Sequence, residues 1–143
     1  MHFLALPFRA GDDELQRRKQ PEIGETGMGL QEERLERGIA YKIEGRYDEA
    51  TAEFQAVLAE NNNHGAAHHQ LGLVYGFVGE FDLSLAELEQ ATRLDPSNIL
   101  SRNDLALTYT MLGRYDEAKV EFARVLEQDE ANDVARRNLT YLQ

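Results

Sequence analysis

Three histidines lie close together in the middle of the chain, and they are the side chains best suited to bind a metal ion. His64 and His68 are four residues apart, which would place two imidazoles on one face of a helix, and His69 follows directly. The apolar pattern predicts a helix that begins near Gly65, so that His64 lies outside it while His68 packs within a helix pair. We therefore expect structural roles for these residues and predict no metal site.

The sequence shows none of the other familiar catalytic patterns. Gly24, Gly27 and Gly29 have neither the following Lys-Ser/Thr pair nor the preceding strand of a phosphate-binding loop. No Ser, His and Asp residues are placed together by their spacing. Four glutamates fall on helix faces that are expected to be exposed to solvent: Glu49, Glu53, Glu117 and Glu121. We expect no catalytic residue and no cofactor, and the protein is predicted not to be an enzyme.

The composition narrows the classes of partner. The chain has 143 residues, enough for one domain with a hydrophobic core, and its 26 Asp and Glu against 15 Lys and Arg give a net charge of −11. This acidity repels nucleic-acid phosphates and anionic lipid headgroups, and no apolar run approaches the ~20 residues that span a bilayer. The lack of cysteine excludes disulfides, thiolate metal ligands and cysteine nucleophiles. We expect no nucleic-acid partner and no membrane span.

Residues 1–30 differ in composition from the rest of the chain. An apolar leader runs from Met1 to Phe8, a charged stretch follows, and Pro21 and three glycines then form a segment typical of a linker. The leader lacks the basic start and the small-residue cleavage site that flank the apolar core of a secretory signal peptide. We therefore expect no signal peptide and a cytoplasmic location.

An internal repeat dominates the remainder. Three consecutive segments of equal length, 31–64, 65–98 and 99–132, align with one another without a gap. Similar residues recur in several columns: Tyr41, Tyr75 and Tyr109; Gly45, Gly79 and Gly113; Tyr47, Phe81 and Tyr115; Phe54, Leu88 and Phe122. The hexapeptide Gly-Arg-Tyr-Asp-Glu-Ala occurs twice. A fixed period of this size is typical of solenoid proteins.

Each unit has the apolar spacing of two short helices with a break between them. The break falls at a glycine, which suits the left-handed conformation that ends a helix, and Pro96 stops the helix before a unit boundary. Two sets of residues are predicted to cap the following helices: Asp48, Asp82 and Asp116 within the units, and Asn63 and Ser97 between them.

Small residues recur where the two helices of a unit come together. They are Gly38, Gly72 and Ala106 on the first helix, and Ala50, Ser84 and Ala118 on the second. A larger side chain in these columns would hold the helices apart. The columns therefore predict close packing within each helix pair.

These columns resemble the tetratricopeptide repeat, whose unit has the same length and the motif Leu-Gly-x2-Tyr, Ala-x3-Phe and a final Pro. The second unit carries most of the motif: Leu71, Gly72, Tyr75 and Pro96. The aromatic residue that opens the motif is replaced by His68 and Arg102. The resemblance implies an all-α, right-handed α-solenoid of three tetratricopeptide-like helical hairpins. Residues 133–143, in phase with a fourth first helix, are expected to form a C-terminal capping helix.

The resemblance also implies which residues face a ligand, because the first helix of each hairpin lines the concave groove in this family. The corresponding positions are mostly apolar: Leu35, Ile39, Lys42 and Ile43; Ala66, His69, Leu73, Gly76 and Phe77; Leu100, Asn103, Leu107, Thr110 and Met111. Relatives that bind the C-terminal carboxylate of chaperone tails have Lys, Arg and Asn at such positions. This chain has Leu35 and Ile39 there, so we expect no carboxylate clamp.

We expect a non-enzymatic protein-interaction scaffold whose groove binds an apolar or amphipathic segment of a protein or peptide, with basic flanks that suit the acidic exterior. A simpler interpretation is that these apolar residues are partly core in a short superhelix. Another is that the leader fills the chain's own groove, or a neighbour's groove in a homo-oligomer, through Phe3, Leu4, Leu6 and Phe8. The leader could equally have no role, with the true start at Met28.

Overall fold

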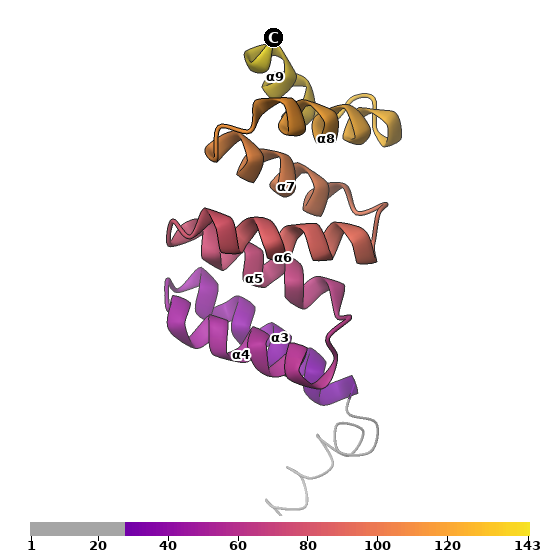
Figure 1. The fold of residues 1–143 in the computed structure, drawn as a ribbon. Coiled ribbons are helices and arrows are strands. Elements are labelled where there is room, and N and C mark those ends of the chain that lie inside the picture. Colours follow the sequence, from indigo (N-terminus) through magenta and orange to yellow (C-terminus); the bar gives the residue numbers. More distant parts are fainter. Residues whose placement is uncertain (1–27) are drawn as a thin grey trace, which may run out of the picture.

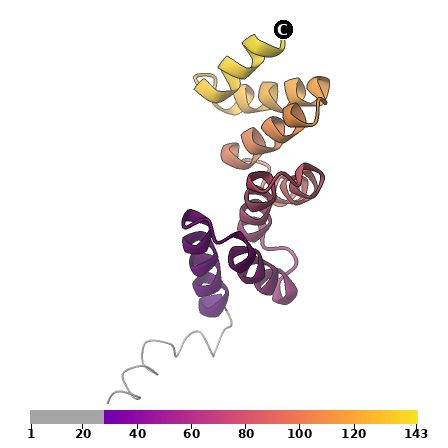
Figure 2. The ribbon, with the colours of Figure 1, turned by 90° about the vertical axis from the view of Figure 1, so that its left-hand side faces the viewer.

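The computed structural model describes residues 28–143, and this part of the chain contains seven helices and no strand. The helices are α3 (Met28–Ile43), α4 (Tyr47–Glu60), α5 (Gly65–Phe77), α6 (Phe81–Leu94), α7 (Ile99–Met111), α8 (Tyr115–Gln128) and α9 (Asp133–Leu142). They stack from α3 and α4 at the bottom of Figure 1 to α9 at the top. The side view shows that their direction changes progressively along the stack (Figure 2). The predicted all-α solenoid of helical hairpins is confirmed.

Within each hairpin a glycine ends the first helix. Gly45, Gly79 and Gly113 have φ angles of 78°, 84° and 76°, which other residues rarely adopt. The amide after each glycine donates to the carbonyl of the tyrosine five residues earlier, over 2.8 Å in all three hairpins. This hydrogen bond closes the helix end in the Schellman motif, and the predicted turn glycines are confirmed.

The predicted caps of the second helices are wrong. Those helices begin two residues after the glycine, and the residues that precede them, Arg46, Glu80 and Arg114, make no capping hydrogen bond with their side chains. The aspartates lie in the first helical turn instead. There a carboxylate is stabilised by the positive end of the helix dipole rather than by capping geometry.

The predicted caps between hairpins are wrong by one residue. The side chains of His64, Asn98 and Asn132 accept hydrogen bonds from the amides of Ala67, Ser101 and Ala135 over 3.0–3.1 Å. Each of these capping residues has extended backbone angles, as the geometry requires. The predicted caps Asn63 and Ser97 belong to the turn itself. The Ser97 hydroxyl donates to Asp95 Oδ1, and the backbone N–H of Asn63 donates to Asn61 Oδ1.

The core lies between the helices of each hairpin and continues between neighbouring hairpins. Phe54, Leu88 and Phe122 are at most 1% exposed, and the first two point at glycines of the preceding helix. A Cβ atom added to Gly38 would lie 2.5 Å from Phe54 Cε1, and one added to Gly72 would lie 2.7 Å from Leu88 Cγ. The predicted close packing within each helix pair is therefore confirmed.

Helix α9 covers the C-terminal end of the stack. Ala135 is fully buried against the core, and Val134, Leu139 and Leu142 pack on the same cluster. Arg136 and Arg137 are exposed. Helix α9 therefore buries one apolar side and leaves a charged side in water, as a terminal cover of a repeat stack requires. None of the helices in the described residues is long and apolar enough to cross a membrane.

The two glycines of α5 provide a matched test of this packing. We expect Gly72→Ala to destabilise the protein by roughly 1–3 kcal/mol, because its Cβ has no room beside Leu88. Gly76→Ala should instead stabilise it by up to about 1 kcal/mol, because its Cβ would make ordinary contact with Ser84 Oγ at 3.5 Å and alanine favours the helix. Urea unfolding measures both, and equal effects of the two substitutions would contradict the packing described.

Candidate functional site

The side chains predicted to line the groove occupy three different environments. Leu35 and Ile39 are half-buried and pack against the core of the first two hairpins. Ile43 and Leu100, near opposite ends of their helices, are 78% and 69% exposed. The third group lies at the junction of α5 and α7, where four apolar side chains come together: Leu73, Phe77, Leu107 and Met111.

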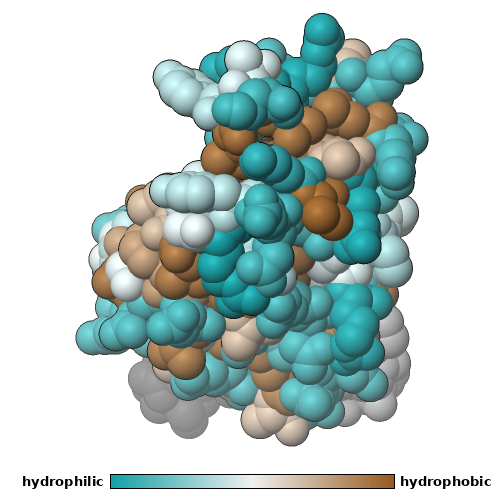
Figure 3. Space-filling view, turned by 45° about the horizontal axis from the view of Figure 1, so that its top comes forward, coloured by the Kyte–Doolittle hydropathy of each residue, from teal (hydrophilic) through white to brown (hydrophobic). Residues whose placement is uncertain are grey.

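This third group forms an open cleft of about 280 Å³ between α5, α6 and α7. Phe77 and Met111 are 59% and 63% exposed, although both are large and apolar. Leu88 and Phe81 contribute from α6. Figure 3, viewed obliquely from the C-terminal end, shows several apolar patches among hydrophilic side chains on that face of the molecule. Apolar surface left open in this way is typical of an interaction site.

A second cleft of about 670 Å³ lies one junction further along the stack. Its lining residues lie on helix faces equivalent to those of the first cleft, one repeat further along the chain. They are Thr110, Tyr115 and Lys119 from the third hairpin, and Asn138, Tyr141 and Leu142 from α9. Tyr141 is 89% exposed there. The concave surface therefore continues from α5 to the C-terminal end.

Polar contacts link the first helices of neighbouring hairpins beside these clefts. Lys42 Nζ donates to Gln70 Oε1 over 2.6 Å, joining α3 to α5, and His69 Nε2 lies 2.7 Å from Asp104 Oδ2, joining α5 to α7. Burial lowers the pKa of Lys42, and the nearby Asp104 carboxylate partly opposes that shift. Asn103 is buried, and its Nδ2 donates to Asn132 Oδ1 over 3.0 Å. These predicted groove residues therefore connect repeats.

The three histidines have separate tasks and do not converge. His64 caps α5, and His69 joins two hairpins. His68 is buried, with Nδ1 2.7 Å from Glu87 Oε1 and Nε2 2.8 Å from the carbonyl oxygen of Asn62. Among residues 28–143 no group of three His, Asp or Glu side chains could hold a metal ion.

The contact of His68 with Glu87 belongs to a row of contacts between a basic residue and a glutamate that sequence reasoning missed. Arg102 Nη1 donates to Glu121 Oε1 over 2.7 Å and Nη2 donates to the carbonyl oxygen of Pro96, in the same pattern. Arg34 Nη1 lies 3.7 Å from Glu53 Oε1 in the first hairpin. Glu121 is only 8% exposed, so its expected place on a solvent face is wrong. The sequence contained a signal for these contacts, because basic residues and glutamates recur at the same positions of successive repeats.

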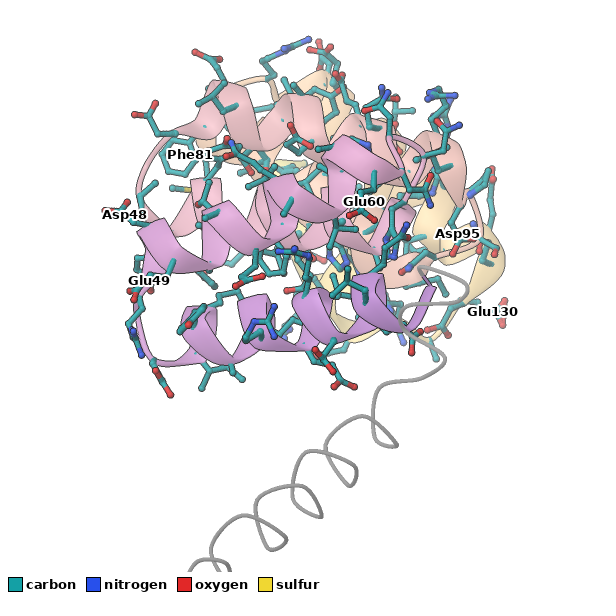
Figure 4. All side chains as sticks on the ribbon, turned by 90° about the horizontal axis from the view of Figure 1, so that it is seen from below. Asp48, Glu49, Glu60, Phe81, Asp95 and Glu130 are labelled. Atoms are coloured by element: carbon teal, nitrogen blue, oxygen red, sulfur yellow. The ribbon has the colours of Figure 1, made fainter. Side chains whose placement is uncertain are left out.

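Exposed Asp and Glu side chains lie at both ends of the helices. Asp48 and Glu49 lie at the end with the turns inside hairpins, and Asp95 and Glu130 lie at the opposite end with the loops between hairpins (Figure 4). All four of these residues are exposed to water, so acidic groups border the stack on two sides. Carboxylates therefore lie at both ends of the helices, and one of them, Glu49, is paired with Arg46.

Comparison with known proteins agrees with this architecture. Residues 78–139 match the family model described as tetratricopeptide repeat. This part of the chain is therefore similar in sequence to tetratricopeptide repeats. No curated protein matches the chain.

Solved structures that share the fold include tetratricopeptide repeat domains. The first such domain of Spaghetti (RPAP3), bound to the HSP90 peptide SRMEEVD, is 21% identical with a TM-score of 0.75, and covers 78% of this chain and 89% of its own. The Arabidopsis OM64 domain is 18% identical with a TM-score of 0.76, covering 81% and 96%. MamA MSR-1 C2 is 28% identical with a TM-score of 0.69, covering 76% and 63%.

The buried pair of Arg102 and Glu121 should contribute far more to stability than an exposed pair on the same helix. Glu121→Ala leaves a buried guanidinium without its carboxylate, and we expect a cost of about 3–5 kcal/mol in the free energy of unfolding. Glu117→Ala removes the exposed pair with Arg114 and should change stability little, because water screens both charges. Urea unfolding of both variants measures the difference, and similar losses would contradict the assigned burial.

Stability should also depend on pH through Tyr109. Burial, and secondly the hydrogen bond from its hydroxyl to Glu89, raise the pKa of Tyr109 from 10.0 to about 12. The unfolded chain therefore releases this proton first, so the contribution to stability is complete below pH 10 and is lost as the pH rises toward 12. Tyr109→Phe should weaken this decline in thermal stability relative to the parent protein. A decline identical in the parent and the variant would contradict the assignment.

Proposed function

We propose that this protein is a non-enzymatic interaction scaffold that binds an apolar or amphipathic peptide along its concave face. The observation that carries the proposal is the open cleft at the junction of α5 and α7, where Phe77 and Met111 are more than half exposed. A folded chain gains nothing in stability from such exposure, so a surface of this kind is usually covered by a partner. An amphipathic helix or an extended apolar segment fits a groove built from parallel rows of helices.

The ends of the groove favour a partner with basic flanks. The chain carries a net charge of −11, and carboxylates line both margins of the stack in Figure 4. Opposite charge accelerates encounter and discriminates against acidic partners. The peptide bound by the first RPAP3 domain, SRMEEVD, contains three acidic residues. In this chain Leu35 and Ile39 are apolar and Lys42 is bound to Gln70, which argues against an acidic tail as the ligand.

The size of the cleft suggests a moderate affinity. A well-buried Leu-sized side chain contributes ~1.5–3 kcal/mol before the costs of association. Two or three such contacts therefore correspond to roughly micromolar binding. Affinity in this range suits a scaffold that assembles reversibly.

The competing occupant is the chain's own leader. Phe3, Leu4, Leu6 and Phe8 lie outside the residues that the structure describes, so their role is a question for experiment. Replacing all four with serine in the full chain tests it. A shift from a larger species to a monomer in light scattering would favour the leader as ligand, and an unchanged mass with intact peptide binding would favour a separate partner.

Two substitutions inside the cleft test the proposal. We expect Leu73→Asp combined with Leu107→Asp to abolish peptide binding, because two carboxylates would face apolar ligand side chains. Leu83→Asp is the matched control: Leu83 is 48% exposed on α6 and does not line the cleft. The measurement is fluorescence anisotropy with peptides selected from a random library displayed on phage.

Circular dichroism must show that both variants keep the helical content of the parent. Binding that survives in the double variant, or that is lost equally with Leu83→Asp, would rule out the concave face as the binding surface.

A further inference from the structure

One column of residues differs in size and polarity between the junctions of the hairpins. Lys42, Gly76 and Thr110 occupy equivalent places, each one repeat apart, on the first helices of the three hairpins. At the first junction the Lys42 side chain reaches across to Gln70 over 2.6 Å, and the rings of Tyr47 and Phe77 pack with their centroids 5.9 Å apart. These contacts bridge the first junction.

At the second junction the member of this column has no side chain. Gly76 lines the 280 Å³ cleft. A Cβ atom added to Gly76 would have only Ser84 Oγ nearby, at 3.5 Å, which is ordinary contact. Close packing therefore does not require glycine here, in contrast to Gly72 one turn earlier, whose Cβ would lie 2.7 Å from Leu88.

The polar groups around the opening are largely satisfied. The Ser84 hydroxyl donates to the carbonyl oxygen of Gly72 over 2.7 Å, and the Thr108 hydroxyl donates to that of Asp104 over 2.9 Å. The Asp104 carboxylate contacts His69 through Oδ2 and lies near Lys42, and a carboxylate can accept further hydrogen bonds at its two oxygens. The opening therefore presents apolar walls and one acidic acceptor at its rim.

We propose that Gly76 creates an anchor pocket for one bulky apolar side chain of a basic amphipathic peptide, with a Lys or Arg of that peptide facing Asp104. The inference rests on the proposed function and specifies the ligand of the same groove. An apolar cavity of about 150 Å³ accommodates a benzene molecule, so 280 Å³ has room for a leucine, methionine or phenylalanine side chain. Met111, at the rim, is flexible enough to adapt to any of them.

Filling the pocket with an apolar side chain distinguishes binding in a specific pocket from non-specific apolar binding along the groove. In Gly76→Met the new side chain occupies the pocket and adds apolar surface without changing the charge. An anchor pocket predicts binding weaker by about tenfold or more, because the ligand side chain is displaced. A groove without a specific pocket predicts equal or tighter binding. Ala86→Met, at an exposed site on α6, is the matched control and should leave affinity unchanged.

The probe is the most enriched peptide from a library of random twelve-residue peptides displayed on phage and selected on the full chain. Anisotropy titrations with the synthetic peptide give the affinity of each variant. Gly76→Leu, which adds a shorter apolar side chain, is a second variant in case the methionine disturbs folding, and it should weaken binding in the same way. Selection on Asp104→Asn should yield peptides in which Lys and Arg near the apolar anchor are no longer enriched.

The outcomes distinguish this pocket from the wider proposal. Binding that is lost in the Leu73→Asp and Leu107→Asp double variant but unchanged or tighter in Gly76→Met overturns the pocket and leaves the groove intact. If no peptide is enriched on the full chain relative to that double variant, both proposals fail. Loss of binding with Gly76→Met, together with unchanged binding to Ala86→Met, supports the pocket.

Discussion

The close approach of the two helices in each hairpin is the contact on which the rest of the structure depends. Gly38 and Gly72 have no side chain, so Phe54 and Leu88 of the opposing helices fill the space between them. Both helices then supply buried apolar side chains, such as Leu71 from α5 and Leu88 from α6. Apolar side chains on the other side of the first helix, such as Leu73 and Phe77, are left facing the concave surface, where neighbouring hairpins only partly cover them.

The contacts between hairpins then determine how much of that surface is open. Polar pairs such as Lys42 with Gln70 and His69 with Asp104 fix neighbouring first helices relative to one another without filling the space between them with apolar side chains. On the opposite side, Tyr109 reaches back to Glu89 of the preceding hairpin. A stack held in this way keeps its shape while it exposes an apolar cleft, and that combination is the physical basis of the proposed binding function.

The repeat made most of this fold predictable from the sequence. Columns of glycine, alanine and tyrosine that recur once in every unit predict the hairpins, the turns at Gly79 and its equivalents, and the close packing at Gly72. Local capping was less predictable, since several polar residues compete in each short loop and backbone angles decide between His64 and Asn63. The burial of Glu121 was missed because amphipathic patterns treat charge as exposed, whereas Arg102 provides a buried partner. The groove residues were assigned by column, and only the structure shows which of them form a cleft together.

The most direct test of a binding surface on the concave face is ¹³C-methyl NMR of the full chain during titration with a library-selected peptide. A peptide in the groove should shift the methyl signals of Leu73, Leu107 and Met111, which line the cleft between α5 and α7. Leu83 and Val120, which are exposed on the second helices, should keep their positions. Shifts centred on Leu83 and Val120, with the cleft methyl signals unmoved, would contradict a groove that binds on its concave side.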